Sequence, residues 1–273
     1  MSGKLYIVGT PIGNLGDFSQ RGIDTLTDCD FIAAEDTRVT LKLLNRFEIK
    51  KPMVSYHEHN KFKTGHQIIE RIAAGENCAL VTDAGMPAVS DPGEDLVREC
   101  LNAGIEVTAV PGPCAFITAL ALSGMPSRRF TFEGFPPPEK AERKKLFETL
   151  VNEERTVIFY EAPHRLAATL KEMAAVFGTR ETAVVKEITK IHEQVLRTDL
   201  VSAAEKYSAE ETKGEFVIII RGCEPRESAD MTEEEAIKYA LDLVKDGISK
   251  TEAAKIASKE SGFRKGDIYK KLI

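Results

Sequence analysis

Short apolar runs alternate with amphipathic stretches along the first half of the chain. The runs at residues 5–8, 30–34, 78–82 and 107–110 have the length and composition of buried strands. The stretches at 20–27, 65–74 and 93–103, and one ending at Phe47, have apolar residues at helical spacing. Because strands and helices alternate with short connections, the pattern predicts a parallel, doubly wound α/β sheet.

The same alternation restarts after Arg129. Strands are predicted at 130–135, 156–160, 182–187 and 215–221, with helices at 139–152, 163–177 and 200–207. The second half therefore has its own sheet and core. We predict two α/β domains, residues 1–114 and 115–223, which meet in a cleft, with Gly124-Met125-Pro126 as a hinge.

The last segment, residues 230–273, has helical patterns only. The capping-box sequences Thr232-x-x-Glu235 and Ser249-x-x-Glu252 open two of its helices, and Gly262 precedes a third. Residues 249–273 carry seven basic and three acidic side chains, although the whole chain has a formal net charge of −6. This asymmetry indicates contact with a polyanion, and the outline resembles a weak helix-turn-helix. A plain helical packing arm is the alternative.

Composition excludes several classes of protein. With 273 residues and 42% hydrophobic content, the chain can bury a large core. The five cysteines stand singly without the spacing of a zinc site, and their odd number does not suit a disulfide framework, which indicates a reducing compartment. No apolar run approaches the roughly 20 residues that span a bilayer. We therefore expect a cytoplasmic protein without metal or membrane contact.

Three of the predicted strands run directly into loops of glycine and proline. These loops are GTPIGN from Gly9, TDAGMPAVSDPG from Thr82 and PGPCA from Pro111. None has the spacing of a nucleotide fingerprint or a phosphate-binding loop. Proline makes such loops rigid, so they favour a nucleoside-like ligand at the carboxyl ends of the strands. Taken singly, each loop also fits an ordinary turn.

These loops belong to a longer series of ordered blocks. The others are AEDTR from Ala34, EGFPP from Glu133, YEAPHR from Tyr160 and KEITKIHE from Lys186. Over essentially the whole chain, the blocks resemble the tetrapyrrole methylase superfamily. Within it, they are similar to the bacterial branch that methylates the ribose 2′-hydroxyl of a cytidine in 16S ribosomal RNA, at the decoding centre of the small ribosomal subunit. The resemblance implies S-adenosylmethionine as cofactor, bound between the two domains, and a homodimer.

The resemblance also implies which residues contact the cofactor. They are Pro11, Asp83, Ala84, Gly85, Met86, Val89, Cys114, Tyr160 and Gly214. For Asp83, a turn in which the carboxylate bonds its own backbone is the alternative.

Methyl transfer to a hydroxyl also needs a group that helps remove the hydroxyl proton. Lys186, whose charge is balanced by that of Glu187, is predicted to be the base or the oxyanion stabiliser. Desolvation in a cleft lowers the pKa of a lysine and so favours its neutral amine. A surface ion pair is the alternative. Substrate contact is predicted for Glu35, Asp36, Arg38, His164 and Arg165, of which the first three are equally able to cap a helix.

An acidic protein binds RNA through local positive charge. The candidate surfaces are Arg128-Arg129, the lysines of residues 140–145 and the carboxyl-terminal helix. Two other functions stay open: methylation of a small porphyrinoid, for which a basic arm has no use, and a non-catalytic ribosome-associated adaptor, which needs no proton-transfer group.

Overall fold

A computed structural model describes residues 2–224 and 231–273. It divides into two compact units, Met1–Gly222 and Cys223–Ile273, which are described separately. The first unit contains two five-stranded sheets, and the described residues of the second form helices without strands. Among the described residues, no helix combines the length and the apolar character needed to cross a membrane.

The first sheet is parallel throughout, as predicted. Its strands are β1 (Lys4–Val8), β2 (Phe31–Ala34), β3 (Met53–Ser55), β4 (Cys78–Val81) and β5 (Glu106–Val110), in the order β3-β2-β4-β1-β5. Its helices are α1 (Gln20–Asp28), α2 (Thr37–Arg46), α3 (Lys61–Ala73) and α4 (Glu94–Asn102), besides the short 3-10 turn η1 (Leu15–Asp17).

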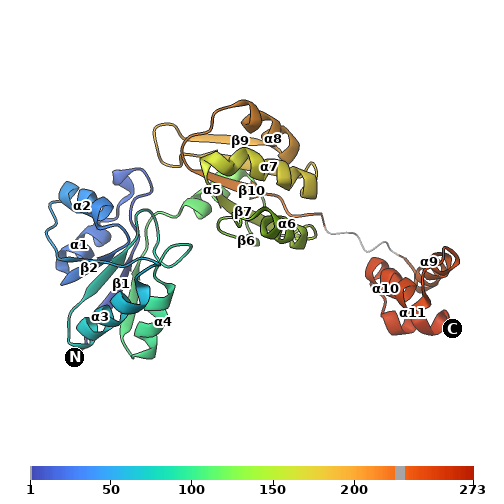
Figure 1. Cartoon of the computed structure of the whole chain (residues 1–273), viewed down its shortest axis with the longest axis horizontal. Helices are drawn as coiled ribbons and strands as arrows, with labels where there is room; N and C mark the ends of the chain where they lie inside the picture. The colour runs from blue at the N-terminus through green and yellow to red at the C-terminus, as the bar shows by residue number, and fades with distance from the viewer. Residues whose placement is uncertain (1, 225–230) are drawn as a thin grey trace. The chain divides into compact units, whose positions relative to one another are not determined.

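Successive strand residues point to opposite faces of this sheet and join different cores. Leu5 and Ile7 pack with α3 and α4, whereas Val8 and Ile32 pack with α1 and α2 (Figure 1). Helices therefore cover both faces, and the ligand-binding edge is left to the loops at the strand ends.

The second sheet is mixed rather than a repeat of the first. Its strands are β6 (Phe130–Phe132), β7 (Thr156–Glu161), β8 (Glu181–Lys186), β9 (Gln194–Asp199) and β10 (Phe216–Ile220), in the order β6-β7-β10-β8-β9. Strand β10 runs antiparallel to both β7 and β8. One face carries α6 (Lys140–Thr149), α7 (Pro163–Phe177) and α8 (Leu200–Ala209), and the other carries α5 (Ala115–Ser123).

Three expectations from the sequence are corrected. The segment Gly124-Met125-Pro126, predicted to be a hinge, is part of the second sheet's core and does not connect the two sheets, because Met125 is buried there with α5. The predicted helix at 65–74 begins earlier, at Lys61, since Asn60 and the polar turn after it extend the helix beyond its apolar stripe. The strands β3 and β9 were not predicted, because one has only three residues and the other is largely polar.

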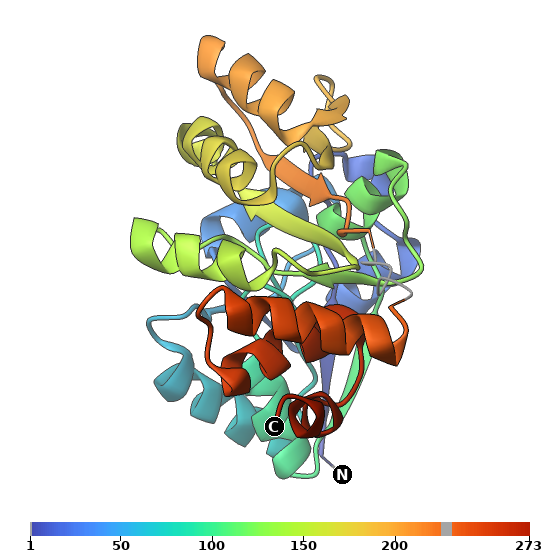
Figure 2. The ribbon, with the colours of Figure 1, turned by 90° about the vertical axis from the view of Figure 1, so that its right-hand side faces the viewer.

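The second unit is a small helical bundle. It consists of the helices α9 (Glu233–Lys245), α10 (Lys250–Ser261) and α11 (Lys265–Lys271) (Figure 2). Their core includes Ala236, Ala257 and Ile268. Thr232 and Glu235 form both hydrogen bonds of the predicted capping box. At Ser249 one of the two bonds is formed, in which the serine hydroxyl accepts from the N–H of Glu252. Gly262 ends α10 at φ +78°, a left-handed conformation that glycine adopts without strain. Residue 230, where the arm was predicted to start, lies outside the described residues.

Candidate active site

The three glycine- and proline-containing loops meet at the carboxyl edge of the first sheet. Thr10 and Gly85 exchange two backbone hydrogen bonds, with N···O distances of 2.9 and 3.1 Å. A Cβ atom on Gly112 would lie 2.7 Å from backbone atoms of Gly9, so only glycine allows this approach of the first and third loops. Tertiary contacts thus bring together three loops that lie far apart in the sequence.

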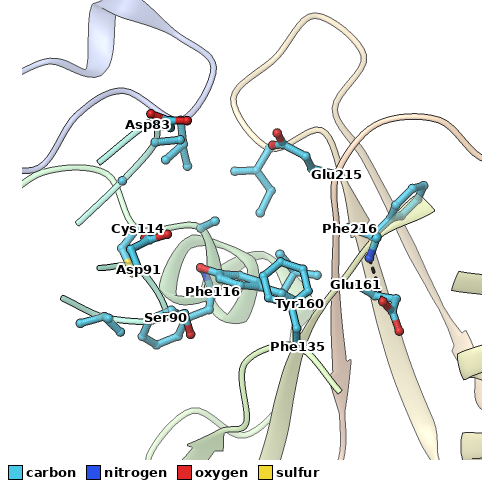
Figure 3. A pocket seen from close by; sticks show the side chains of 18 of the residues that line it. Asp83, Ser90, Asp91, Cys114, Phe116, Phe135, Tyr160, Glu161, Glu215 and Phe216 are labelled. Carbon is cyan, nitrogen blue, oxygen red and sulfur yellow. Dashed lines mark hydrogen bonds between the residues drawn. The ribbon is translucent and has the colours of Figure 1, made fainter. Parts of the chain in front are cut away.

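A cavity of about 410 Å³ opens at this edge and extends to the second sheet. Its size suits one small-molecule ligand. The first sheet contributes the loops after β1, β2, β4 and β5, and the second sheet contributes the ends of β7 and β10 and the loop after β8 (Figure 3). The cavity is therefore built from both α/β parts of the first unit.

Most of the residues predicted to bind the cofactor line this cavity. They are Asp83, Ala84, Gly85, Met86, Val89, Cys114, Tyr160 and Gly214, together with Glu35 from the predicted substrate set. Pro11 does not line it, although its neighbour Ile12 does. The blocks quoted from the sequence therefore converge in space.

Three carboxylates stand at the first-sheet side of the cavity: Glu35, Asp83 and Asp91. Burial, followed by the charges of Glu35 and Asp83, raises the pKa of Asp91 to about 7. Burial also raises the pKa of Glu35 and of Asp83. The charge of Asp36 adds to both shifts, and the charge of Asp83 adds to that of Glu35. The cavity thus favours a positively charged ligand, and the carboxyl group of Asp91 changes its protonation state near neutral pH.

Tyr160 lies among aromatic rings on the opposite wall. Its hydroxyl accepts a hydrogen bond of 3.2 Å from the backbone N–H of Phe116, at the start of α5. The ring of Phe132 lies edge-on to it at 5.0 Å and that of Phe135 at 5.4 Å. Burial raises the pKa of the Tyr160 phenol, so this hydroxyl stays protonated.

Backbone strain is concentrated in two loops at the cavity. Among the described residues, five non-glycine residues have positive φ, and four of them lie in these loops: Ala88, Ser90, Glu187 and Thr189. Such conformations cost about 1–3 kcal/mol each and persist where the surroundings hold them in place. Strain of this kind gathers at binding and catalytic sites, which agrees with the position of the cavity.

The predicted catalytic pair occupies two different positions. Lys186 does not line the cavity, and its ammonium group lies 5.9 Å from the centroid of the Phe216 ring. Strand alternation places Lys186 on the same face of the second sheet as Val184, which packs with α7 and α8. This is the face opposite to the one that α5 covers.

Glu187 instead supports the loop that borders the cavity. Its Oε1 accepts hydrogen bonds of 2.9 Å from the backbone N–H of Glu215 and from Lys190 Nζ. Partial burial opposes ionisation, but these two bonds and the positive charges of Lys190 and Lys186 together outweigh it and lower the pKa of Glu187. A Cβ atom on Gly214 would lie 2.6 Å from the same Oε1, so glycine is needed beside this carboxylate.

The other predicted substrate residues lie outside the cavity lining. Asp36 caps α2 and pairs with the exposed Arg38, and its N–H also donates to Asp83 at 3.1 Å. His164 is exposed in the first turn of α7. Arg165 donates to the carbonyl oxygens of Pro136 and Pro137.

Several cavity residues were not singled out from the sequence. Asp91 and Ser90 belong to the quoted block after Thr82, and Phe135 belongs to EGFPP. The second aspartate of a loop rich in glycine and proline was the available signal for Asp91. Glu161 belongs to the quoted block YEAPHR, whereas Phe116 reads as part of an apolar helix and gave no such signal.

The cavity fits S-adenosylmethionine, a nucleoside joined to an amino acid through a sulfonium cation. The carboxylates of Asp83 and Asp91 suit its positive charges, and Ile12, Met86 and Val217 provide an apolar wall. The loops at Ala84-Gly85 and Gly214 bring the backbone close to the ligand space. Within the described residues, no group of three His, Cys, Asp or Glu side chains is arranged to hold a metal ion.

Comparison with known proteins places the chain in a family. Residues 4–204 match the family model of the tetrapyrrole (corrin/porphyrin) methylases. A protein of Xylella fastidiosa named ribosomal RNA small subunit methyltransferase I is 46% identical over 98% of both chains. A Thermotoga maritima protein of the same name is 44% identical. The match spans the whole of that protein and 81% of this chain.

The similarity to solved structures concerns the fold. The crystal structure of the methyltransferase CobJ superposes with a TM-score of 0.62 at 15% identity, covering 81% of this chain and 95% of that one. The two sheets, the cavity between them and the family match agree with one another, and the chain belongs to the tetrapyrrole (corrin/porphyrin) methylase family.

Proposed function

We propose that this protein transfers a methyl group from S-adenosylmethionine to the ribose 2′-hydroxyl of a cytidine in 16S ribosomal RNA, at the decoding centre of the small ribosomal subunit. The observation that carries the proposal is the near-complete match to relatives named as small-subunit ribosomal RNA methyltransferases. A cavity whose charge and walls suit the cofactor supports it. The reaction would take place in the bacterial cytoplasm, where ribosomes work.

The cofactor, when bound, supplies an electrophilic methyl group on a sulfonium cation. We propose that Asp83, Ala84, Gly85, Met86, Val89, Cys114, Tyr160 and Gly214 hold it, with Pro11 acting through the position of Ile12. The carboxylates on the first-sheet side favour the cation over a neutral ligand. Aligning the hydroxyl with this methyl group is the main task of such a site.

The ribose hydroxyl loses its proton as its oxygen attacks. Asp91 lines the cavity, and its pKa of about 7 lets its carboxylate accept a proton at neutral pH. We propose that Asp91 takes this proton, with Glu35 beside it as a second acceptor. The predicted role of Lys186 is the alternative, and it requires the amine to leave the Phe216 ring. Glu187 would act by positioning the loop at Gly214.

The carboxyl-terminal unit is the proposed contact with RNA phosphate. All seven basic side chains of residues 249–273 are exposed on α10 and α11 and the turns before them. The Thermotoga maritima relative is matched over its whole length by only 81% of this chain. We propose that the carboxyl-terminal unit adds affinity for the subunit without taking part in the chemistry. A homodimer is the predicted assembly, which sedimentation equilibrium tests.

The direct experiment measures transfer of a labelled methyl group to small ribosomal subunits that lack the modification, followed by mass spectrometry of the nucleosides. We expect 2′-O-methylcytidine at the decoding centre. Subunits that already carry the methyl group serve as the control and should accept none. Cofactor binding without transfer to any subunit would contradict the proposal and direct the search to a porphyrinoid acceptor.

A further inference from the structure

An exposed aromatic ring stands at the edge of the cavity. Phe135 lines the cavity, yet 56% of the residue is exposed to solvent. Its ring centroid lies 5.4 Å from that of Tyr160 on the cavity wall (Figure 3). Full burial of a phenylalanine side chain is favourable by about 1.5–3 kcal/mol of free energy. Because Phe135 is only partly buried, a partner that covered its ring would gain part of this free energy.

The segment that carries Phe135 is held tightly to the second sheet. The N–H of Glu133 donates to the carbonyl of Ile158, and the carbonyl of Gly134 accepts from the N–H of Tyr160, both at 2.9 Å. Beyond the ring, three consecutive prolines fix φ and have no N–H of their own. Phe135 is thus presented from a stiff backbone.

Two arginines bind the carbonyl groups of these prolines. Arg165 donates to Pro136 at 2.7 Å, and Arg143 donates to Pro137 at 3.0 Å and Pro138 at 2.8 Å. Arg143 is only 7% exposed and also makes a two-point ion pair with Glu172, at 2.8 and 2.9 Å. Because the buried Arg143 side chain binds two carbonyl groups of this surface loop, the loop is held in a fixed conformation.

The interior of the cavity does not need this ring for its ligand. Ile12, Met86 and Val217 already provide an apolar wall, and about 410 Å³ suits a single small molecule. A nucleotide that brings its ribose hydroxyl to such a ligand can leave its base at the mouth of the cavity. Bases of single-stranded or flipped nucleotides are commonly held by stacking on aromatic side chains.

We infer that Phe135 is the stacking platform for the base of the target nucleotide, placed at the mouth of the cavity so that the ribose of that nucleotide faces inward. The inference rests on the proposed function and adds the residue that positions its substrate. Gly134 also lies against the loop of the first sheet, since a Cβ atom there would be 3.2 Å from Ser90 Oγ. Val89 of that loop is partly exposed and lines the same cavity.

The test compares variants at Phe135 in the full chain, with small ribosomal subunits as substrate. Stacking is worth about 1–3 kcal/mol per base, so Phe135→Ala should lower kcat/KM for subunits by roughly 5- to 150-fold. Phe135→Trp keeps a stacking face and should retain most activity, whereas Phe135→Leu keeps apolar area only and should resemble alanine. The Kd for S-adenosylmethionine should stay unchanged in all three variants.

The matched control is Phe62→Ala, because Phe62 is 74% exposed on α3 and does not line the cavity. It should behave as wild type. An equal loss of cofactor affinity in Phe135→Ala would assign the ring to the cofactor and overturn the inference, as would wild-type kinetics. Failure of the wild-type protein to form 2′-O-methylcytidine would instead overturn the proposed function, and this inference with it.

Discussion

The carboxylate of Glu187 accepts a 2.9 Å hydrogen bond from the backbone N–H of Glu215. This bond links the loop after β8 to the residues that border the cavity before β10. Lys190 joins both acids, at 2.9 Å to Glu187 and 3.1 Å to Glu215. A side chain adjacent to the predicted base thus shapes the cavity wall through a backbone contact.

Removing this carboxylate should weaken cofactor binding. A hydrogen bond to a charged group is worth about 1.5–3 kcal/mol, and partial exposure here reduces it, so Glu187→Ala should raise the Kd for S-adenosylmethionine about tenfold. Glu187→Gln keeps an oxygen toward Glu215 and should lose much less. Isothermal titration calorimetry measures both. A normal Kd with a reduced kcat would return Glu187 to the catalytic role predicted from the sequence.

The role of Asp91 predicts a particular pH profile. Because the carboxylate accepts the proton only when ionised, kcat/KM should rise with pH through about 7 in the wild-type protein. Glu35 and Asp83 interact with Asp91, so the apparent value belongs to the group of three. In Asp91→Asn the rate should fall roughly 100-fold and this limb of the profile should disappear.

Lys186→Ala provides the comparison for that experiment. The Lys186 ammonium lies over the Phe216 ring and does not line the cavity, so the rate should change by less than about threefold. A large loss in Lys186→Ala together with a normal Asp91→Asn profile would favour the lysine as base. Methyl transfer to subunits at several pH values measures both variants.

Asp91 should also make stability depend on pH. Its folded-state pKa of about 7 lies above the ordinary value of 3.8, so the folded state binds the proton more tightly than the unfolded state. The free energy of unfolding should therefore fall as pH rises from about 4 to about 7 and then level off. In Asp91→Asn this residue has no proton to lose, so the variant escapes this decrease in stability. The difference between its free energy of unfolding and that of wild type should therefore shift in favour of the variant across that pH window. Urea unfolding at pH 5 and pH 8 checks it, and equal differences at both values would contradict it.

The basic arm makes a prediction about salt dependence. Changing Lys265, Lys270 and Lys271 to serine should weaken subunit binding and reduce the slope of log K against log salt by about 2–3. Cofactor affinity should not change. The three residues are exposed, so the arm's core around Ile268 stays intact, whereas deletion of residues 249–273 would leave α9 without its packing partners.

The charge-matched control changes Lys42, Lys50 and Lys63 to serine in the same way. These three lysines are exposed and lie in the part of the chain that forms the first sheet. Filter binding of small subunits over a range of salt concentrations compares the two sets. An equal effect of both sets would show a response to net charge alone and would assign no contact to the arm.

Hydrophobic periodicity alone was enough to predict four of the five strands of the parallel first sheet and most helices, among them the helix from Pro163 to Phe177. Such patterns are local, because burial of one face requires apolar residues at the spacing of the element itself. The direction of β10 was not predictable in this way, since a fully buried strand has the same composition whether it runs parallel or antiparallel to its neighbours.

The quoted blocks supplied most of the cavity lining, including Asp83, Met86 and Tyr160, because each follows a strand end where a loop can carry a side chain to a ligand. The sequence by itself thus determined the sheet-forming segments and the loops that bear chemistry. Only the tertiary structure separated Asp91, inside the cavity, from Lys186, on the far face of β8. That choice depends on strand alternation and on the charges of Glu35 and Asp83 meeting in space, which no single segment encodes.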